Sequence, residues 1–181
     1  DDGTLTAEEL SNALEVAGSQ VASTFGFGML DGMDVFATAP LLDADMDTPE
    51  EQAEVAAFRT ANEALAAVMQ SIGDDAVPTQ EPGDVLMALA LDLGDGAVDG
   101  RAGEAPVDEL ASAPNFSTLV VADPSTLMIP GTTIPVADSD ELLASELSVT
   151  GVVVDATDLA NGDIAADPEP AATVPDTDSD G

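Results

Sequence analysis

Residues 48–73 have the sequence TPEEQAEVAAFRTANEALAAVMQSIG, and this stretch decides the fold because it predicts one long helix. Thr48 is placed to cap the helix, Pro49 takes its first position, and Glu51 completes a capping box. Apolar residues then recur at steps of three and four, which keeps them on one helical face. This seam comprises Val55, Phe58, Asn62, Leu65, Met69 and Ile72, with Asn62 as its polar member. We expect a helix from about Pro49 to Ile72, ended by Gly73 and packed on a core; a groove for a cofactor or partner is the alternative.

A second amphipathic helix is expected near the start of the chain. Thr6 and Glu9 have the spacing of a capping box, in which each side chain bonds to the backbone N–H of the other residue. The apolar residues that follow at helical spacing are Leu10, Leu14, Ala17 and Val21. These features predict a helix over residues 6–24.

The sequence FGFGMLDGM, residues 25–33, follows this helix and combines glycine with large apolar side chains. Glycine permits backbone turns that other residues avoid. We therefore interpret the stretch as a buried loop or broken turn. Exposed apolar or Gly-rich surface within residues 25–42 would be a candidate assembly face, and burial of that surface is the alternative.

Two shorter helices are expected after the Pro-rich connector at residues 78–82. Asp84 is placed to cap the first, which runs from Val85 to Leu93 and is apolar nearly all round, so we expect it to be buried. A loop rich in Gly and Asp follows at residues 94–103. Residues 107–113 are expected to form the second short helix.

The pattern changes after Pro114, where short apolar runs are separated by Pro, Gly, Asp and Ser. Extended segments are expected at residues 117–122, 127–129, 132–136 and 147–155. The expected fold class is therefore α+β: an N-terminal helical part of about three to four helices, then a small β-rich part and an extended acidic tail. The corresponding divisions are a helical domain at 1–113, a β-rich part at 114–164, and an acidic Pro/Ala/Asp linker at 165–181.

Charge is the dominant feature of the composition. The chain of 181 residues has 37 Asp plus Glu, two Arg, no Lys and no His, for a formal net charge of −35. Such a chain repels itself when compact, and screening by salt or bound divalent cations relieves the repulsion. Because nucleic acids and anionic membranes are bound through Lys and Arg, we expect neither as a partner. No apolar stretch is long enough to insert into a membrane.

The residue types needed for most enzyme chemistry are missing. The chain has no His, Cys, Lys or Tyr, which removes the usual general bases, the thiol nucleophile and the Schiff-base amine. Paired carboxylates could act on glycosides, but the chain has no Trp or Tyr to stack on a sugar. We therefore expect no enzymatic activity.

The two ends of the chain carry complementary parts of a calcium-binding pattern. Calcium prefers about six to eight oxygen ligands, and an EF-hand loop places carboxylates at positions 1, 3, 5 and 12 with Gly at position 6. The C-terminal sequence DTDSDG matches positions 1 to 6 with Asp176, Asp178 and Asp180. Near the N-terminus, Asp2 matches position 5 and Glu9 position 12, ahead of the predicted helix.

These ends resemble the two halves of a calcium loop of the EF-hand, dockerin or thrombospondin type 3 kind. The resemblance implies calcium as the cofactor. If Asp180 is superimposed on Asp2, it also implies one unit of a tandem array with a period of 178 residues. The alternative is that an Asp-rich chain acquires this spacing by chance and its ends are solvated.

A second candidate metal site lies within the chain. Asp43, Asp45, Asp47 and Glu54 have the same 1, 3, 5 and 12 spacing and precede the long helix, although Thr48 replaces the Gly. The alternative is an acidic, solvated helix N-terminus. Weaker acidic turns contain Asp92, Asp95 and Asp99, and Asp155, Asp158 and Asp163.

The expected function is that of a non-enzymatic, extracellular or cell-surface structural or adhesive module stabilised by calcium. Since the chain begins at Asp1 without a basic, apolar leader, we expect a mature product or an excised segment. Its expected partners are neighbouring copies or modules of the same protein. The alternative is a self-assembling filament or virion subunit from a high-salt environment, without specific calcium sites. A third class, a halophilic soluble protein that binds a cationic or small ligand, lacks the signal of an aromatic-lined pocket.

Overall fold

A computed structural model of the chain describes residues 6–30, 32–38, 49–140, 142–143 and 169–171. In chain order the elements are α1 (Ala7–Phe25), α2 (Pro49–Asp75), α3 (Pro82–Asp92), the 3₁₀ turn η1 (Leu93–Asp95), β1 (Arg101–Ala102), β2 (Ala105–Pro106), α4 (Asp108–Ala111), α5 (Phe116–Leu119), and the 3₁₀ turns η2 (Pro124–Thr126) and η3 (Val136–Asp138). The described residues are rich in helix and contain one small antiparallel sheet, which is consistent with the expected α+β class.

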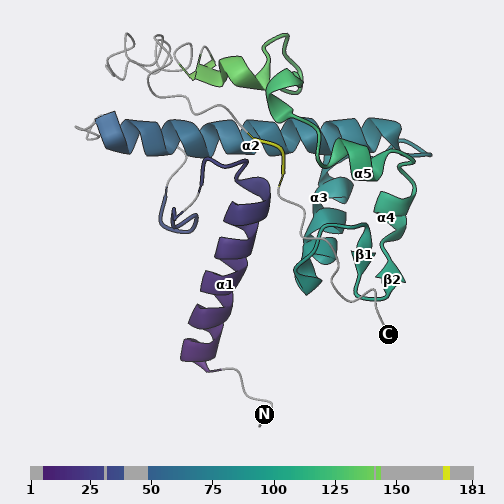
Figure 1. Cartoon of the computed structure of the whole chain (residues 1–181), viewed down its shortest axis with the longest axis horizontal. Helices are drawn as coiled ribbons and strands as arrows, with labels where there is room; N and C mark the ends of the chain where they lie inside the picture. Colours follow the sequence, from purple (N-terminus) through teal and green to yellow (C-terminus); the bar gives the residue numbers. More distant parts are fainter. Residues whose placement is uncertain (1–5, 31, 39–48, 141, 144–168, 172–181) are drawn as a thin grey trace.

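The long helix α2 is the centre of the fold. It lies across the molecule, with α3, α4, α5 and the β1–β2 hairpin grouped near its C-terminal half, while α1 points away from it (Figure 1). Contacts join α2 to α3, α5, η2 and η3. Because neighbours pack along more than one side of α2, its buried surface is wider than a single seam.

The predicted helix is confirmed, and Val55 and Ile72 from the two ends of the predicted seam are buried, but the buried surface of α2 extends beyond that seam. At the centre of that seam Asn62 is exposed and Leu65 is only partly buried. The most deeply buried positions are Ala64, Val68 and Ile72, whose exposed fractions are 0%, and of these three the predicted seam contains Ile72. Alanine lets neighbouring segments approach closely, so a small side chain occupies the centre of a closely packed contact.

The prediction that Gly73 ends this helix is wrong, because α2 continues to Asp75. Gly73 is buried, and a Cβ placed on it would lie 2.7 Å from the carbonyl oxygen of Gln80. The backbone N–H of Gln80 also donates to the Gly73 carbonyl at 3.0 Å. Glycine at this position therefore permits the chain to fold back against α2 on its way to α3.

The prediction that the third helix is buried nearly all round is also wrong. Val85, Ala88 and Leu89 of α3 are buried against the core, whereas Met87 is 72% and Leu91 is 59% exposed. Glu81, rather than Asp84, is the N-cap residue, and Pro82 begins the helix. An apolar composition did not reveal that α3 packs through one face only.

The extended segment expected at residues 117–122 is wrong, because Phe116–Leu119 form the helix α5. Phe116 and Val120 are both buried, and their separation of one helical turn brings them to the same face. The segments expected at 127–129 and 132–136 do pair, through an antiparallel bridge between Met128 and Pro135. The segment expected at 147–155 lies outside the described residues.

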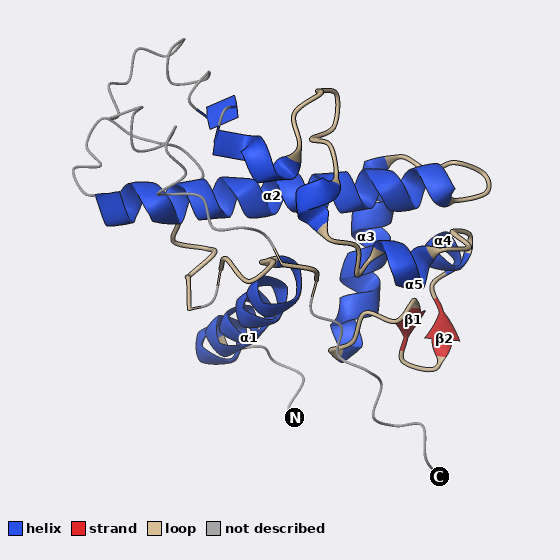
Figure 2. Cartoon of the chain, turned by 45° about the horizontal axis from the view of Figure 1, so that its top comes forward, coloured by secondary structure: helices blue, strands red, loops and turns tan. Residues whose placement is uncertain are grey.

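Strand β1 lies within the loop predicted at residues 94–103, and β2 lies just after it. Arg101 pairs with Pro106 and Ala102 with Ala105, and Figure 2 shows this hairpin beside α3. The hairpin follows the 3₁₀ turn at the end of α3. The hairpin therefore begins at the C-terminal end of the segment expected to be a Gly/Asp loop.

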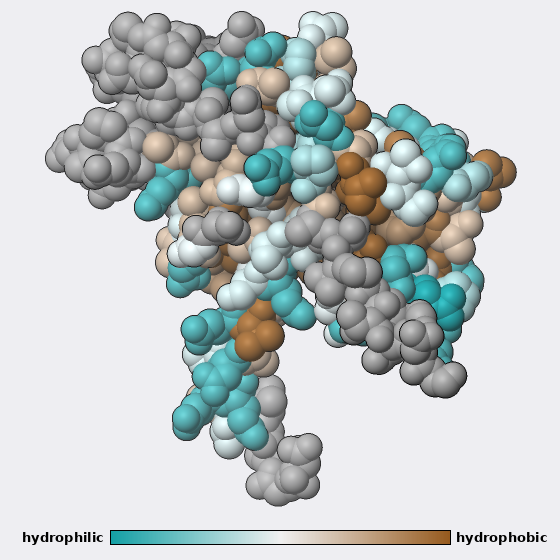
Figure 3. Space-filling view, viewed as in Figure 1, coloured by the Kyte–Doolittle hydropathy of each residue, from teal (hydrophilic) through white to brown (hydrophobic). Residues whose placement is uncertain are grey.

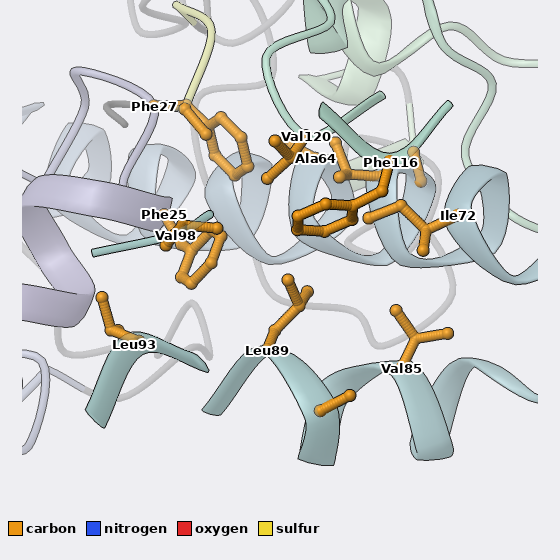
Figure 4. Packing of buried hydrophobic residues seen from close by; sticks show 14 of the residues in the cluster. Phe25, Phe27, Ala64, Ile72, Val85, Leu89, Leu93, Val98, Phe116 and Val120 are labelled. Atoms are coloured by element: carbon orange, nitrogen blue, oxygen red, sulfur yellow. The ribbon is translucent and has the colours of Figure 1, made fainter. Parts of the chain in front are cut away.

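One core joins the helices on both sides of residue 114. Figure 4 shows apolar side chains from α2, α3 and α5 and from the turn after α1 pointing into a shared space. Its labelled members are Phe25, Phe27, Ala64, Ile72, Val85, Leu89, Leu93, Val98, Phe116 and Val120. Within the described residues, the packing thus does not separate a helical core from a β-rich one.

Candidate functional site

Among the described residues, helix α1 is buried against the body only near its C-terminal end. Its capping box is confirmed: Thr6 Oγ1 accepts from Glu9 N at 3.2 Å, and Glu9 Oε2 accepts from Thr6 N at 2.9 Å. Residues 7–17 are all exposed, and burial begins at Gly18. Figure 3 shows α1 projecting from the body with apolar surface among its hydrophilic side chains.

The turn after α1 provides the attachment. Phe25 and Phe27 are buried, and Phe27 adopts a left-handed backbone with φ of 50°. The predicted buried turn in this glycine-rich segment is therefore confirmed. Exposure returns further along the chain, where Phe36 is 66% exposed.

A groove of about 590 Å³ lies between α1 and residues 30 and 32–36. We call it the α1 groove, and its main apolar lining residues are Leu14, Ala22, Leu30, Met33, Val35 and Phe36. Two carboxylate residues, Glu15 and Asp34, also line it. The residues 25–42 that the sequence offers as a candidate assembly face thus contain both buried anchors and an exposed groove wall.

Two contacts hold in place the wall of the groove that lies opposite α1. A Cβ on Gly18 would lie 2.8 Å from Cε2 of Phe36, so the ring packs directly on the α1 backbone. Asp34 Oδ1 accepts from Phe36 N at 3.0 Å and forms a tight turn. The groove is therefore shaped by a glycine and a carboxylate that the sequence pattern alone does not connect.

Two of the nine predicted metal ligands, Glu9 and Glu54, lie within the described residues. Glu9 belongs to the capping box, where hydrogen bonds from the Thr6 backbone N–H and hydroxyl lower the pKa of its carboxyl. Glu54 is exposed on α2. The ligands outside the described residues are Asp2, Asp43, Asp45, Asp47, Asp176, Asp178 and Asp180. Within the described ranges, no group of three metal-ligating residues comes together.

The acidic turn at residues 92–103 is organised by hydrogen bonds to its own backbone. Asp92 is 0% exposed, and its Oδ1 accepts from Gly100 N at 3.0 Å and from Arg101 N at 2.7 Å. Asp95 accepts from the backbone N–H groups of Ala97 and Gly103. These bonds give the carboxylates a structural role in closing the loop onto α3.

The two carboxyls of this turn are perturbed in opposite directions. Burial, the largest effect, raises the pKa of Asp92 despite its backbone hydrogen bonds. Its Oδ2 is buried with no hydrogen-bond partner. Hydrogen bonds from Gly103 and Ala97 lower the pKa of exposed Asp95. Burial rather than sequence spacing therefore distinguishes these two residues.

Comparisons with known proteins found no matching family model, curated protein or solved structure. Among the helices in the described ranges, none combines the length and apolarity needed to cross a membrane.

Proposed function

We propose that this chain is a non-enzymatic, extracellular structural or adhesive module that contacts neighbouring modules or copies of the same protein. The observation that carries the proposal is the exposure of α1. A helix of 19 residues presents Leu10, Leu14 and Val21 to solvent at 41–47% exposure, while its C-terminal end is anchored in the core. The exposed part of α1, residues 7–17, spans only 11 residues, and an isolated helix that short is marginal in water, so a contact that covers the apolar stripe would stabilise it.

The composition supports a binding role over a catalytic one. The chain contains no His, Cys, Lys or Tyr to act as general base or covalent nucleophile. The α1 groove is lined by apolar side chains together with three serines and two carboxylates. Such a surface is suited to holding another polypeptide.

Calcium at the chain ends is the proposed means of joining successive modules. Glu9 would supply the bidentate carboxylate of one half, and Asp176, Asp178 and Asp180 would supply ligands of the other. Because Glu9 already accepts from Thr6, calcium must share this carboxylate with the capping box or displace that bond. Calcium binding is therefore expected to alter the start of α1.

The test is thermal unfolding and sedimentation velocity at fixed ionic strength with calcium, with magnesium and with chelator. A site present only in the folded state raises stability by about 2.7 kcal/mol at a hundredfold excess over its dissociation constant. We expect calcium to raise the midpoint and promote end-to-end association, with little effect of magnesium. The Asp178→Asn/Asp180→Asn variant should lose both responses, whereas Glu81→Gln, an exposed carboxylate on another element, should keep them. Equal responses to both cations, or none, would refute calcium-joined modules.

Self-assembly without calcium is the second candidate, favoured by the exposed apolar residues Leu86, Met87 and Leu91 of α3. Salt would screen the net charge of −35 and let such faces meet. Association that grows with salt and is indifferent to chelator would support this candidate over the first.

A further inference from the structure

The α1 groove combines an accessible apolar surface with preformed walls. Leu14 is 47% and Phe36 is 66% exposed, and they face the groove from its two sides. Leu30 and Ala22 are buried at 5% and 6% and form its apolar base. One turn before Leu14, Leu10 is 46% exposed and extends the apolar surface along α1.

The extent of the groove suits a helical segment. The groove holds about 590 Å³, and its lining follows α1 from Ser11 to Ser23. An amphipathic helix places apolar side chains into such a groove at steps of three and four residues. The half-buried Met33 adds an adaptable side chain that accommodates different apolar partners.

The charge of the groove selects the kind of helix. Glu15 and Asp34 lie on opposite walls, and no basic residue is among the described residues that line it. The only basic side chains of the chain are Arg59 and Arg101, on α2 and β1. A second copy would therefore bring an acidic surface against an acidic groove, whereas Lys and Arg would pair with Glu15 and Asp34.

We propose that the α1 groove binds an amphipathic, Lys/Arg-rich helix of a partner protein. Apolar side chains of that helix lie between Leu14 and Phe36, and its cationic side chains flank them next to Glu15 and Asp34. This inference rests on the proposed non-enzymatic binding role; it assigns the α1 groove to a partner of opposite charge and leaves the chain ends as the place where neighbouring modules or copies meet.

The probe is a synthetic peptide as long as α1, 19 residues, with Leu at helical spacing and Lys elsewhere. A peptide of the same composition with the Leu residues scrambled is its control. Titration calorimetry at about 0.15 M and about 1 M salt, conditions that differ in Debye length, separates apolar from electrostatic binding. We expect saturable binding of one peptide per chain, at least about tenfold tighter for the amphipathic peptide than for the scrambled one, and weaker binding at high salt.

Matched variants locate the site. Leu14→Ser/Phe36→Ser removes apolar contact from both walls and should weaken binding by about tenfold or more. The control Met87→Ser/Leu91→Ser removes exposed apolar residues from α3 and should change affinity by less than about twofold. Circular dichroism checks that each variant keeps the helical content of the parent chain.

A charge variant keeps the test informative if the apolar variant unfolds. Glu15→Gln/Asp34→Asn preserves side-chain size, and the amide oxygen introduced at position 34 can still accept from the Phe36 N–H. This variant should weaken binding by about two- to tenfold at low salt and flatten its salt dependence, as expected for two exposed ion pairs. Glu81→Gln/Glu104→Gln changes the charge equally outside the groove and should have little effect.

Three results would overturn the inference. Equal binding of the scrambled peptide would mean general attraction to an acidic chain. Unchanged affinity in both groove variants would place the peptide elsewhere. Self-association that strengthens with salt and is lost in Leu14→Ser/Phe36→Ser would identify a second copy as the occupant. Failure of peptide binding with an intact calcium response would overturn this inference alone, whereas loss of the calcium response alone would overturn only calcium-joined modules.

Discussion

Replacing Asp92 by Ala is expected to destabilise the fold, whereas replacing it by Asn is not. Asp92 is the last residue of α3, and its fully buried carboxylate receives the N–H groups of Gly100 and Arg101. Alanine leaves these two donors without their acceptor as the chain enters β1. Asparagine keeps one oxygen in the same place.

The magnitude follows from two opposing effects. Each hydrogen bond to a charged acceptor contributes about 1.5–3 kcal/mol, so losing two costs about 3–6 kcal/mol. Removing the buried Oδ2, which has no partner, returns about 1–3 kcal/mol. We therefore expect Asp92→Ala to lower the free energy of unfolding by about 2–3 kcal/mol, and Asp92→Asn to lie within about 1 kcal/mol of the parent chain at neutral pH.

Urea unfolding followed by far-ultraviolet circular dichroism measures both values, because urea leaves ionic strength unchanged and the chain lacks Trp and Tyr for fluorescence. A loss below about 0.5 kcal/mol for Asp92→Ala would refute the hydrogen-bonding role. Equal losses of unfolding free energy in Asp92→Ala and Asp92→Asn would refute the view that position 92 needs an oxygen acceptor rather than a negative charge.

Comparing the parent chain with Asp92→Asn also tests how stability depends on pH. Burial raises the pKa of Asp92 above its ordinary value of 3.8, so between these pKa values the folded state holds more protons than the unfolded state. The contribution of Asp92 to stability therefore falls as pH rises through this window and is most favourable below 3.8. Since Asp92→Asn keeps every other carboxyl, the parent chain should gain stability relative to this variant as pH falls through the window. A difference in stability between the two chains that stays constant with pH would contradict a pKa of Asp92 raised by burial.

Three further substitutions test packing and capping by the same unfolding measurement. Gly73→Ala places a Cβ 2.7 Å from the Gln80 carbonyl oxygen and should cost about 1–3 kcal/mol despite the higher helix propensity of alanine; a gain in stability would contradict this contact. Ile72→Ala empties a fully buried position and should cost about 2–5 kcal/mol, and a cost below about 1 kcal/mol would mean that the site is not closely packed. Thr6→Ala removes a cap that contributes about 0.5–2 kcal/mol to α1. Because residues 7–17 are exposed, this variant should lower the helical content without moving the midpoint of global unfolding. A shifted midpoint would show that α1 unfolds together with the core.

Local signals in the sequence predict the two long helices, α1 and α2, but not α5. The capping box of Thr6 and Glu9 and the proline at the start of α2 locate two helix starts, because these features act through neighbouring backbone groups. The end of α2 is predicted too early because Gly73 does not end the helix but makes room for the backbone of Gln80. That contact depends on how the chain folds back, which no local pattern contains.

The candidate binding surface is only partly predictable. Apolar spacing identifies Leu10 and Leu14 as one face of a helix but does not say whether the core or solvent covers that face. The groove exists because Phe36 packs on Gly18, a contact between residues 18 positions apart. A glycine in a helix and an aromatic residue shortly after the glycine-rich turn that follows the helix are the signal that could have indicated it.

Hydrogen–deuterium exchange of the free chain, and of the chain with the Leu/Lys peptide, tests the central claim most directly. If α1 is an exposed element that binds another polypeptide, amides of residues 10–17 should exchange far faster than those around Ala64 and Val68, and the peptide should protect them. Residues 10–17 that are as protected in the free chain as the α2 core would mean that α1 is packed rather than available. Rapid exchange that the peptide leaves unchanged would contradict binding at α1.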